Sequence, residues 1–259
     1  MIRHGFAILL LTALTQVGGI AWLLALLTRS FGRFFVLFLA FYTALSVGAH
    51  FAAPMAGRTA LPCLDAGPTQ VAVLNPLYCA LNRNYVTSAM KTHADAVASH
   101  MHEQFPGTRT RALDASFPLL DGFPLLPHLT HDDGQKLDLA LYWDDAAGTY
   151  QLARAKSIIG YWGFAVPRAG ETQSCADETG LSLRWDLDWL QPYLRDWTLN
   201  EARTGAALRW LANNPTGTDY KLFIEPYLAK RLGVQSEHVR FQGCKAARHD
   251  DHIHVEFRP

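Results

Sequence analysis

Two long apolar stretches near the start of the chain constrain its fold more than any other feature. Residues 6–27 and residues 34–53 contain no Asp, Glu, Lys or Arg, and each matches the ~20 residues that a helix needs to cross a bilayer. A cleavable signal peptide is the alternative for the first stretch, but no small-x-small cleavage motif precedes the charged turn, and the second stretch follows closely. The sequence therefore predicts a transmembrane helical hairpin in residues 1–58.

The charges that flank these stretches predict their orientation. Arg29 and Arg33 lie in the connection between the stretches, whereas the outer flanks carry only Arg3 and Arg58, and residues 1–58 contain no other charged side chain. Segments rich in Lys and Arg tend to stay in the cytoplasm. We therefore expect a cytoplasmic connection in the inner (cytoplasmic) membrane, with the following soluble domain facing the periplasm.

The charge balance of residues 59–259 excludes one class of partner. This region has 23 acidic and 19 basic side chains. A surface that binds nucleic acid normally has a marked excess of Lys and Arg, so we expect no nucleic-acid partner. The length of the region fits one soluble domain with its own core.

The four cysteines indicate an oxidising compartment. They are even in number, lie outside the apolar stretches, and form no CxxC pair of the kind that binds metals. Of the possible pairings we favour Cys63 with Cys79, which closes a short local loop, and Cys175 with Cys244, which ties a mid-chain loop to the C-terminal segment. Buried free thiols in a reducing compartment are the alternative.

The rest of the chain mixes helical and strand-like patterns. Apolar spacing predicts a helix over residues 84–104 and one or two more over residues 185–213. Alternation predicts a strand over residues 136–143, with Asp138 on its polar face. Further strands are predicted over residues 157–164, 221–225 and 252–257. The mixture indicates an α+β fold, with two N-terminal transmembrane helices, a linker over residues 59–80, and a domain over residues 81–259 whose small central antiparallel sheet is flanked by helices.

A histidine-rich segment near the end of the chain gives the first chemical signal. In a strand, His252, His254 and Glu256 would point to one face, and the apolar residues between them would point to the other. The apolar face can then pack inward and leave two imidazoles in a cleft. An HxH pair alone is weak evidence for a metal site, because edge strands often carry polar residues.

A second segment strengthens the metal hypothesis. His131 precedes a turn that Asp132, Asp133 and Gly134 are suited to form, and Asp138 follows on the polar face of the next strand. Beside the HxH strand, these residues would form a three-ligand site with an open fourth position, as a catalytic zinc requires. Taken singly, His131 would be a solvated loop residue and Asp138 a strand-end acid.

The two motifs together resemble those of the LAS metallopeptidases, and within them the penicillin-insensitive murein endopeptidases. The resemblance consists of HxxG with an Asp seven residues after its histidine, His128 three residues before that histidine, and the H-x-x-H-x-H ending. It covers about residues 80–259. It implies that His131, Asp138 and His254 hold a zinc ion (Zn2+), and that His128 binds substrate.

The resemblance also implies hydrolysis of a peptide bond in peptidoglycan with the help of a catalytic base. His249 and His252 match histidines of the endopeptidase branch, and Asp251 occupies the position of a Glu in the D-Ala-D-Ala peptidase branch. Strand geometry turns Asp251 away from the His252 face unless a bulge intervenes. We therefore favour His252 as the base.

Two departures from the endopeptidase pattern bear on the substrate. Residues 123–127 replace a Gly-rich loop that contains Arg, and Lys136 stands where an acid is usual. The expected function is a membrane-anchored zinc metallopeptidase, a murein endopeptidase acting on peptidoglycan peptides. The alternatives are a D,D-carboxypeptidase on the same fold, a non-catalytic zinc-containing module of the envelope, and a membrane protein whose soluble domain binds a partner.

Overall fold

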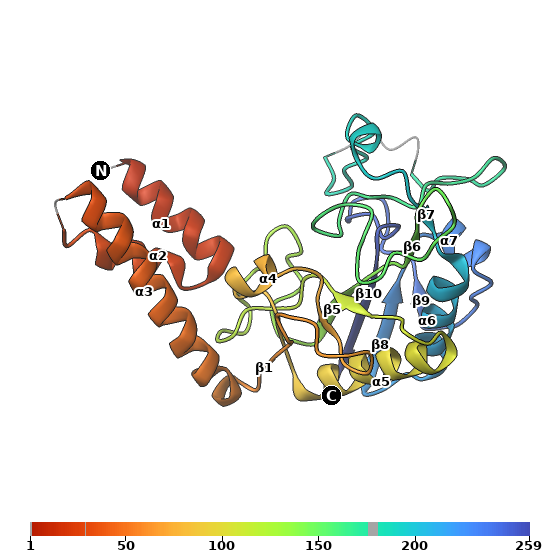
Figure 1. Cartoon of the computed structure of the whole chain (residues 1–259), viewed down its shortest axis with the longest axis horizontal. Helices are drawn as coiled ribbons and strands as arrows, with labels where there is room; N and C mark the ends of the chain where they lie inside the picture. Colours follow the sequence, from red (N-terminus) through yellow and green to blue (C-terminus); the bar gives the residue numbers. More distant parts are fainter. Residues whose placement is uncertain (1, 29, 176–180) are drawn as a thin grey trace.

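A computed structural model describes residues 2–28, 30–175 and 181–259, in which an N-terminal helical unit stands beside a mixed helix-and-sheet domain (Figure 1). The helices are α1 (Ile2–Thr15), α2 (Gly18–Ala25), α3 (Phe31–Ala52), η1 (Ala53–Ala56), α4 (Leu77–Ala80), α5 (Ser88–Gln104), η2 (Gln191–Tyr193), α6 (Glu201–Asn213) and α7 (Pro226–Arg231). The strands are β1 (Thr59–Ala60), β2 (Ala72–Val73), β3 (Tyr85–Val86), β4 (Arg111–Ala112), β5 (Lys136–Ala140), β6 (Trp143–Asp144), β7 (Thr198–Leu199), β8 (Thr218–Phe223), β9 (Val239–Arg240) and β10 (His252–Arg258).

The first apolar stretch is not a single helix. Its helix ends before Gln16, which has a positive φ of 67°, and α2 then runs back along α1. Gly19 permits this close packing, because a Cβ atom there would lie only 1.9 Å from Oγ1 of Thr12. With 14 and 8 residues, α1 and α2 extend about 21 and 12 Å, less than the ~30 Å of a hydrocarbon core. The two expected transmembrane helices are therefore not confirmed. In the part of the chain that the structure describes, one segment, Phe31–Ala56, is long and apolar enough to cross a membrane.

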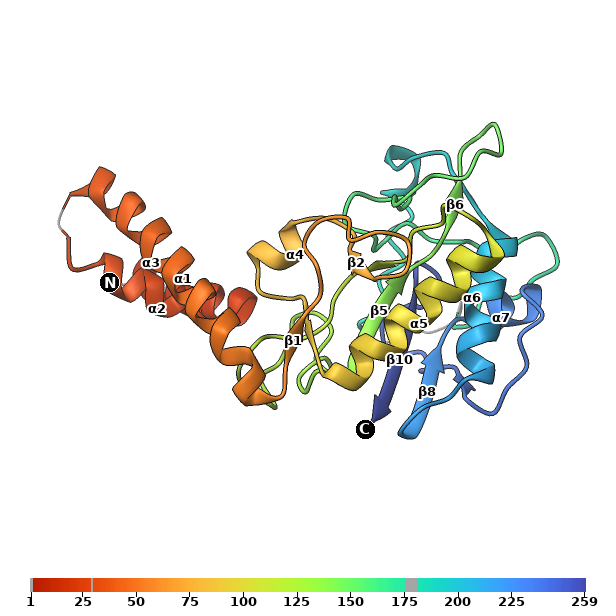
Figure 2. The ribbon, with the colours of Figure 1, turned by 60° about the horizontal axis from the view of Figure 1, so that its bottom comes forward.

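The break also changes which ends of the helical unit lie together. Figures 1 and 2 show that α1 and α3 both begin at the end of the unit farthest from the sheet. Arg3 in α1 and Arg33 in α3 belong to this end, and Arg29 lies outside the described residues. A simple hairpin would have placed Arg3 and Arg33 at opposite ends.

The opposite end of the helical unit contacts the domain through polar groups. The side-chain amide of Asn82 donates to the carbonyl of Thr15 and to the hydroxyl of Ser46, each at 3.2 Å. The backbone N–H of Leu119 donates to the Gln16 side chain at 3.1 Å. The helical unit is therefore docked on the domain by hydrogen bonds as well as by the chain connection.

A six-stranded sheet in the order β2-β4-β5-β10-β8-β9 forms the centre of the domain. Its central pairings, from β4 to β8, are antiparallel, as predicted, whereas β2 and β9 pair in parallel at the two edges. Helices α5 and α6 lie across the sheet (Figure 2). Val97 of α5 and Leu208 of α6 share one buried cluster with Leu139 and Ile253 of the central strands. One face of β5 and β10 thus packs in the hydrophobic core.

Three segments differ from the sequence-based prediction. Residues 185–213, predicted to contain one or two helices, are α-helical only in α6, and residues 198–199 form strand β7. Residues 157–164, predicted to be a strand, form a series of bends, and the positive φ of 66° at Trp162 is incompatible with a strand. Residues 59–80, expected to be a linker, contribute β1, β2 and α4, and Leu61 and Val73 are part of the domain core.

Both favoured disulfides are present and confirm the predicted pairing. They join Cys63 to Cys79 and Cys175 to Cys244. The first holds the segment before α4, and the second holds the end of a long loop against the chain that leads into β10. Such bonds persist in oxidising compartments.

Candidate metal centre

The pairing of β5 with β10 brings the predicted ligands together. Asp138 lies directly opposite His254 in the antiparallel register, and His252 lies opposite Ala140. Since side chains alternate along a strand, these polar residues point to the face opposite that of Ile253 and the other core residues. The two motifs, more than one hundred residues apart, therefore meet on one face of the sheet, as predicted.

His131 completes the arrangement from the loop before β5. Its Nδ1 lies 2.8 Å from the carbonyl oxygen of Ala115, so the Nδ1–H donates to that oxygen and the lone pair is on Nε2. The Nε2 atom lies 3.1 Å from Nδ1 of His254 and 3.3 Å from Oδ1 of Asp138. The remaining distance, from Nδ1 of His254 to Oδ1 of Asp138, is 2.9 Å.

These three donor atoms have the spacing that a metal ion requires. A tetrahedral zinc ion with bonds of about 2.0–2.1 Å holds its ligand atoms about 3.3–3.4 Å apart, so the observed triangle needs to expand by only a few tenths of an ångström. His131, Asp138 and His254 are 1%, 0% and 3% exposed. Two imidazoles and one carboxylate are also suitable ligands for a transition metal. The residues therefore fit a metal ion.

The surrounding side chains offer further ligand atoms. Two groups of three residues could each hold a metal ion within the described chain: His128 with His131 and Asp138, and His249 with His252 and His254. The predicted ligand set takes two residues from the first group and His254 from the second. We favour this set, because its donor atoms converge on one another and the side chain of His252 has a different partner.

The partner of His252 is Asp251. The Nδ1–H of His252 donates to Oδ1 of Asp251 at 2.5 Å, and Nε2 of the same ring lies 3.6 Å from Oδ1 of Asp138. The second oxygen of Asp251 accepts a hydrogen bond from the backbone N–H of Trp162 at 2.5 Å. Asp251 precedes β10 and reaches the outer edge of the imidazole, so it orients His252 while Nε2 faces the metal centre.

His128 lies between two carboxylates at the entrance of the site. Its Nδ1 is 3.1 Å from Oδ2 of Asp138 and 3.3 Å from Oδ2 of Asp114. Burial disfavours its charged form, but the two carboxylates outweigh burial and raise the pKa of His128 to about 10. Burial likewise opposes ionisation of Asp138, yet His131, His252 and His128 hold the pKa of its carboxyl well below the usual range. The site thus favours an ionised Asp138 beside a cationic His128.

His249 lies behind the strand histidines. Its ring centroid is 4.8 Å from that of His252 and 5.7 Å from that of His254. Burial, followed by the charges of His252 and His254, holds the pKa of His249 well below its usual value. The structure therefore brings all seven residues singled out from the sequence into one cluster.

Sequence reasoning missed three residues of this cluster. Asp114 binds His128 and is held by two hydrogen bonds from Arg83, at 2.6 and 2.7 Å. The Tyr161 hydroxyl donates to Oδ2 of Asp138 at 2.6 Å, and Trp162 holds Asp251. No local pattern in the sequence marks Asp114, and Tyr161 and Trp162 were assigned to a strand.

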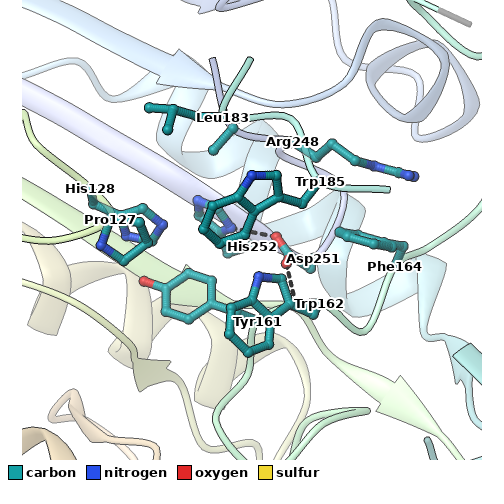
Figure 3. Close-up of a pocket in the computed structure, with 11 residues that line it drawn as sticks. Pro127, His128, Tyr161, Trp162, Phe164, Leu183, Trp185, Arg248, Asp251 and His252 are labelled. Carbon is teal, nitrogen blue, oxygen red and sulfur yellow. Dashed lines mark hydrogen bonds and ion pairs between the residues drawn. The ribbon is translucent and has the colours of Figure 1, made fainter. Parts of the chain in front are cut away.

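Three adjoining cavities open around the site and share Pro127 and His128. The histidine branch is lined by His131, Asp138, His249, His252 and His254 and contains the candidate metal centre. The aromatic branch is lined by Trp162, Phe164, Leu183 and Trp185 beside the Asp251–His252 pair (Figure 3). The apolar branch is lined mainly by Leu77, Tyr78, Leu81, Leu126 and Ile159.

The arginines among the described residues that line these branches are already paired. Arg83, in the apolar branch, is bound to Asp114. Arg248, in the aromatic branch, donates to Asp250 at 3.0 Å and to Asp186 at 2.8 Å. No lysine is among the described lining residues. His128, which lines all three branches, is flanked by Asp114 and Asp138. Because the cationic side chains among the described lining residues each have an acidic partner, these branches suit neutral groups better than a free carboxylate.

No protein-family model matches the chain, and no curated protein matches it in sequence.

Proposed function

We propose that this protein is a membrane-anchored zinc peptidase that hydrolyses internal peptide bonds of peptidoglycan. The observation that carries the proposal is the triangle of His131, Asp138 and His254, whose donor atoms lie 2.9–3.3 Å apart on one face of the sheet. The motifs that supply these residues resemble those of the murein endopeptidases. The bound ion would be zinc, because its tetrahedral geometry and its preference for nitrogen and oxygen ligands match this set.

Zinc, when bound, supplies Lewis acidity that polarises a peptide carbonyl and makes water acidic enough to attack near neutral pH. His252 is the general base in this proposal. Its Nδ1–H is donated to Asp251, so Nε2 is free to take the proton of the attacking water. Asp251 keeps the ring in this tautomer and stabilises the imidazolium that forms.

His128 is positioned to bind the substrate and to stabilise negative charge on it. It lies at the junction of the three branches, and its ring is stacked 5.7 Å from that of His252. A donor held there by Asp114 and Asp138 can contact the carbonyl oxygen as charge develops on it. Tyr161 acts through Asp138, because its hydroxyl donates a hydrogen bond to the second carboxylate oxygen of that residue.

The charges of the cavities favour an internal bond over the carboxyl-terminal bond of the alternative function. A D,D-carboxypeptidase needs a group that recognises the free carboxylate of its substrate, and an unpaired arginine is well suited to this role. Arg83 and Arg248 are both occupied by acidic side chains. A substrate that continues in both directions needs no such partner.

The helical unit supports a location at the periplasmic face of the inner membrane. Arg3 and Arg33 are near the first residues of α1 and α3, which begin at the end of the unit away from the domain, and the positive-inside rule assigns that end to the cytoplasm. With α3 as the membrane-spanning helix, the domain then lies in the periplasm. This side agrees with the two disulfides and gives access to the wall.

The test is incubation of the zinc-loaded full chain, in detergent, with intact peptidoglycan, followed by product masses. The proposed function requires cross-linked muropeptides to be converted to uncross-linked ones, and His254→Ala to abolish the conversion. Release of single terminal residues would instead identify a carboxypeptidase. Stoichiometric zinc without any product would leave the binding module as the correct alternative.

A further inference from the structure

The aromatic branch is a built cavity beside the proposed catalytic base. Figure 3 shows Trp162 and Trp185 on either side of the Asp251–His252 pair. Their ring centroids are 6.4 Å apart and their planes are inclined by 43°. Trp185 is 45% exposed although it lines this cavity. Large aromatic surface left accessible at such a place indicates a ligand.

The backbone of Trp162 is held in an unfavourable conformation. Its φ of 66° is in the left-handed region, which costs a bulky residue roughly 1 kcal/mol or more. Hydrogen bonds fix it there: its N–H donates to Asp251, and its carbonyl accepts from Nε2 of Gln191 at 2.7 Å. The same residue therefore supplies an indole to the cavity wall and a donor to the Asp251–His252 pair.

The charged groups of the aromatic branch are internally compensated. Arg248 is bound to Asp250 and Asp186, and its guanidinium lies 3.8 Å from the ring centroid of Phe164. Asp251 is bound to His252 and Trp162. A ligand group in this branch thus meets flat apolar walls and no unpaired charge among the described lining residues.

The chemistry of a neutral sugar ring matches these apolar walls. The carbon–hydrogen faces of a pyranose pack on indole rings, while its hydroxyl and acetamido groups stay at the polar edge. The stem peptides of peptidoglycan carry charged groups, whereas the N-acetylated sugars to which they are attached are neutral.

We propose that Trp162 and Trp185 form a subsite for a neutral N-acetylated sugar ring of the glycan strand. The catalytic consequence rests on the proposed function: the enzyme prefers cross-linked peptides that still carry their sugars. The binding of the sugar itself does not depend on hydrolysis. The two parts are therefore tested separately.

The binding test is titration calorimetry of the zinc-loaded full chain with oligomers of N-acetylglucosamine. Trp185→Ala should weaken binding about tenfold or more, because one stacking wall is lost, and Trp185→Phe should retain part of the affinity. Trp189→Ala is the matched control, since Trp189 is 69% exposed and does not line the cavity. Absence of sugar binding by the native protein, or an equal effect of Trp189→Ala, would overturn the subsite.

The hydrolysis test compares one cross-linked peptide with and without its disaccharide. The native enzyme should have the higher kcat/KM for the sugar-bearing form, and Trp185→Ala should bring the ratio of the two values close to one. An unchanged ratio in the variant means that the wall holds peptide, and it rejects the sugar subsite. Sugar binding without hydrolysis of either substrate would reject the proposed function and retain the subsite.

Discussion

Nε2 of His131 lies 3.1 Å from Nδ1 of His254, although the two residues are 123 positions apart in the chain. The approach depends on the loop that ends at β5 and on the pairing of β5 with β10. It leaves two nearly inaccessible nitrogen atoms beside the carboxylate of Asp138.

The first prediction concerns the metal. The full chain, purified without chelator, should contain close to one zinc per molecule, and His254→Ala should lose it, because two remaining ligands hold the ion poorly. His100→Ala, on helix α5 and outside the cluster, is the control and should keep the metal. Elemental analysis decides the matter, and full zinc occupancy in His254→Ala would refute the ligand assignment.

The second prediction separates the base from the ligands. His252→Ala should keep its zinc and lose roughly two to four orders of magnitude in turnover, the usual contribution of general acid–base catalysis. Asp251→Asn should also keep the zinc and cost roughly 10–100-fold, because Asp251 only orients the ring. Muropeptide turnover and zinc content are measured on the same preparations.

The opposite order of effects would change the mechanism. If Asp251→Asn abolished turnover with zinc intact while His252→Ala remained nearly active, Asp251 itself would be the base. The site would then work like that of the D-Ala-D-Ala peptidase branch, and the carboxypeptidase alternative would become the better assignment.

The third prediction concerns topology. A membrane-impermeant thiol reagent applied to spheroplasts should label a cysteine introduced at Gly170 in the domain, but not one introduced at Ser30. A cysteine at Ile2 should also stay unlabelled, because α1 and α3 begin at the same end of the helical unit. Labelling of position 2 but not of position 30 would restore the simple hairpin. Labelling of both positions 2 and 30, with position 170 unlabelled, would reverse the orientation.

The fourth prediction concerns the pH dependence of stability. His93, which is 7% exposed, hydrogen-bonds the hydroxyl of Tyr220 at 2.9 Å and packs against Trp210 and Phe257. Burial lowers the pKa of His93 to about 4. As the pH falls from about 6.5 to 4, the unfolded chain takes up a proton at this position while the folded protein does not. The free energy of unfolding should therefore fall, by on the order of 1–3 kcal/mol.

His93→Gln tests this contribution. Glutamine retains a hydrogen-bonding group for Tyr220 but does not titrate, so the free energy of unfolding should depend less steeply on pH between 4 and 6.5 than in the native protein. Denaturant unfolding at a series of pH values measures the slope. The same change at His102, near the end of helix α5, is the control, and an identical slope in His93→Gln and the native protein would contradict the prediction.

Local patterns in the sequence were sufficient for part of the structure. The alternation of apolar and polar residues correctly predicted that Asp138 and His254 lie on the polar faces of two strands. When the apolar face of a strand is buried, the residues between the apolar ones must point to the other face. Helical spacing located α5 to within a few residues at its start. The sequence allowed three pairings of the four cysteines, and the favoured one, Cys63 with Cys79 and Cys175 with Cys244, is present in the structure.

Other features depended on contacts that no local pattern contains. The apolar stretch of residues 6–27 looked like one spanning helix, yet the turn at Gln16 is stabilised by packing of α2 on α1 and by the contact of Gln16 with Leu119. Trp162 was assigned to a strand, but Asp251 and Gln191, distant in sequence, hold it in a left-handed conformation.

The sequence by itself thus determined the secondary structure of β5 and β10 and the histidines and acids on their polar faces, because these follow from periodicity and residue chemistry. It favoured the observed pairs of cysteines without excluding the other pairings. Only the tertiary structure decided that Asp114 and Tyr161 contact the candidate site and that Asp251 orients His252 from outside the strand. It also decided that, among the described residues, one helical segment is long and apolar enough to cross a membrane. The physical reason is that each of these depends on hydrogen bonds and packing between segments far apart in the chain, whose geometry exists only once the sheet is assembled.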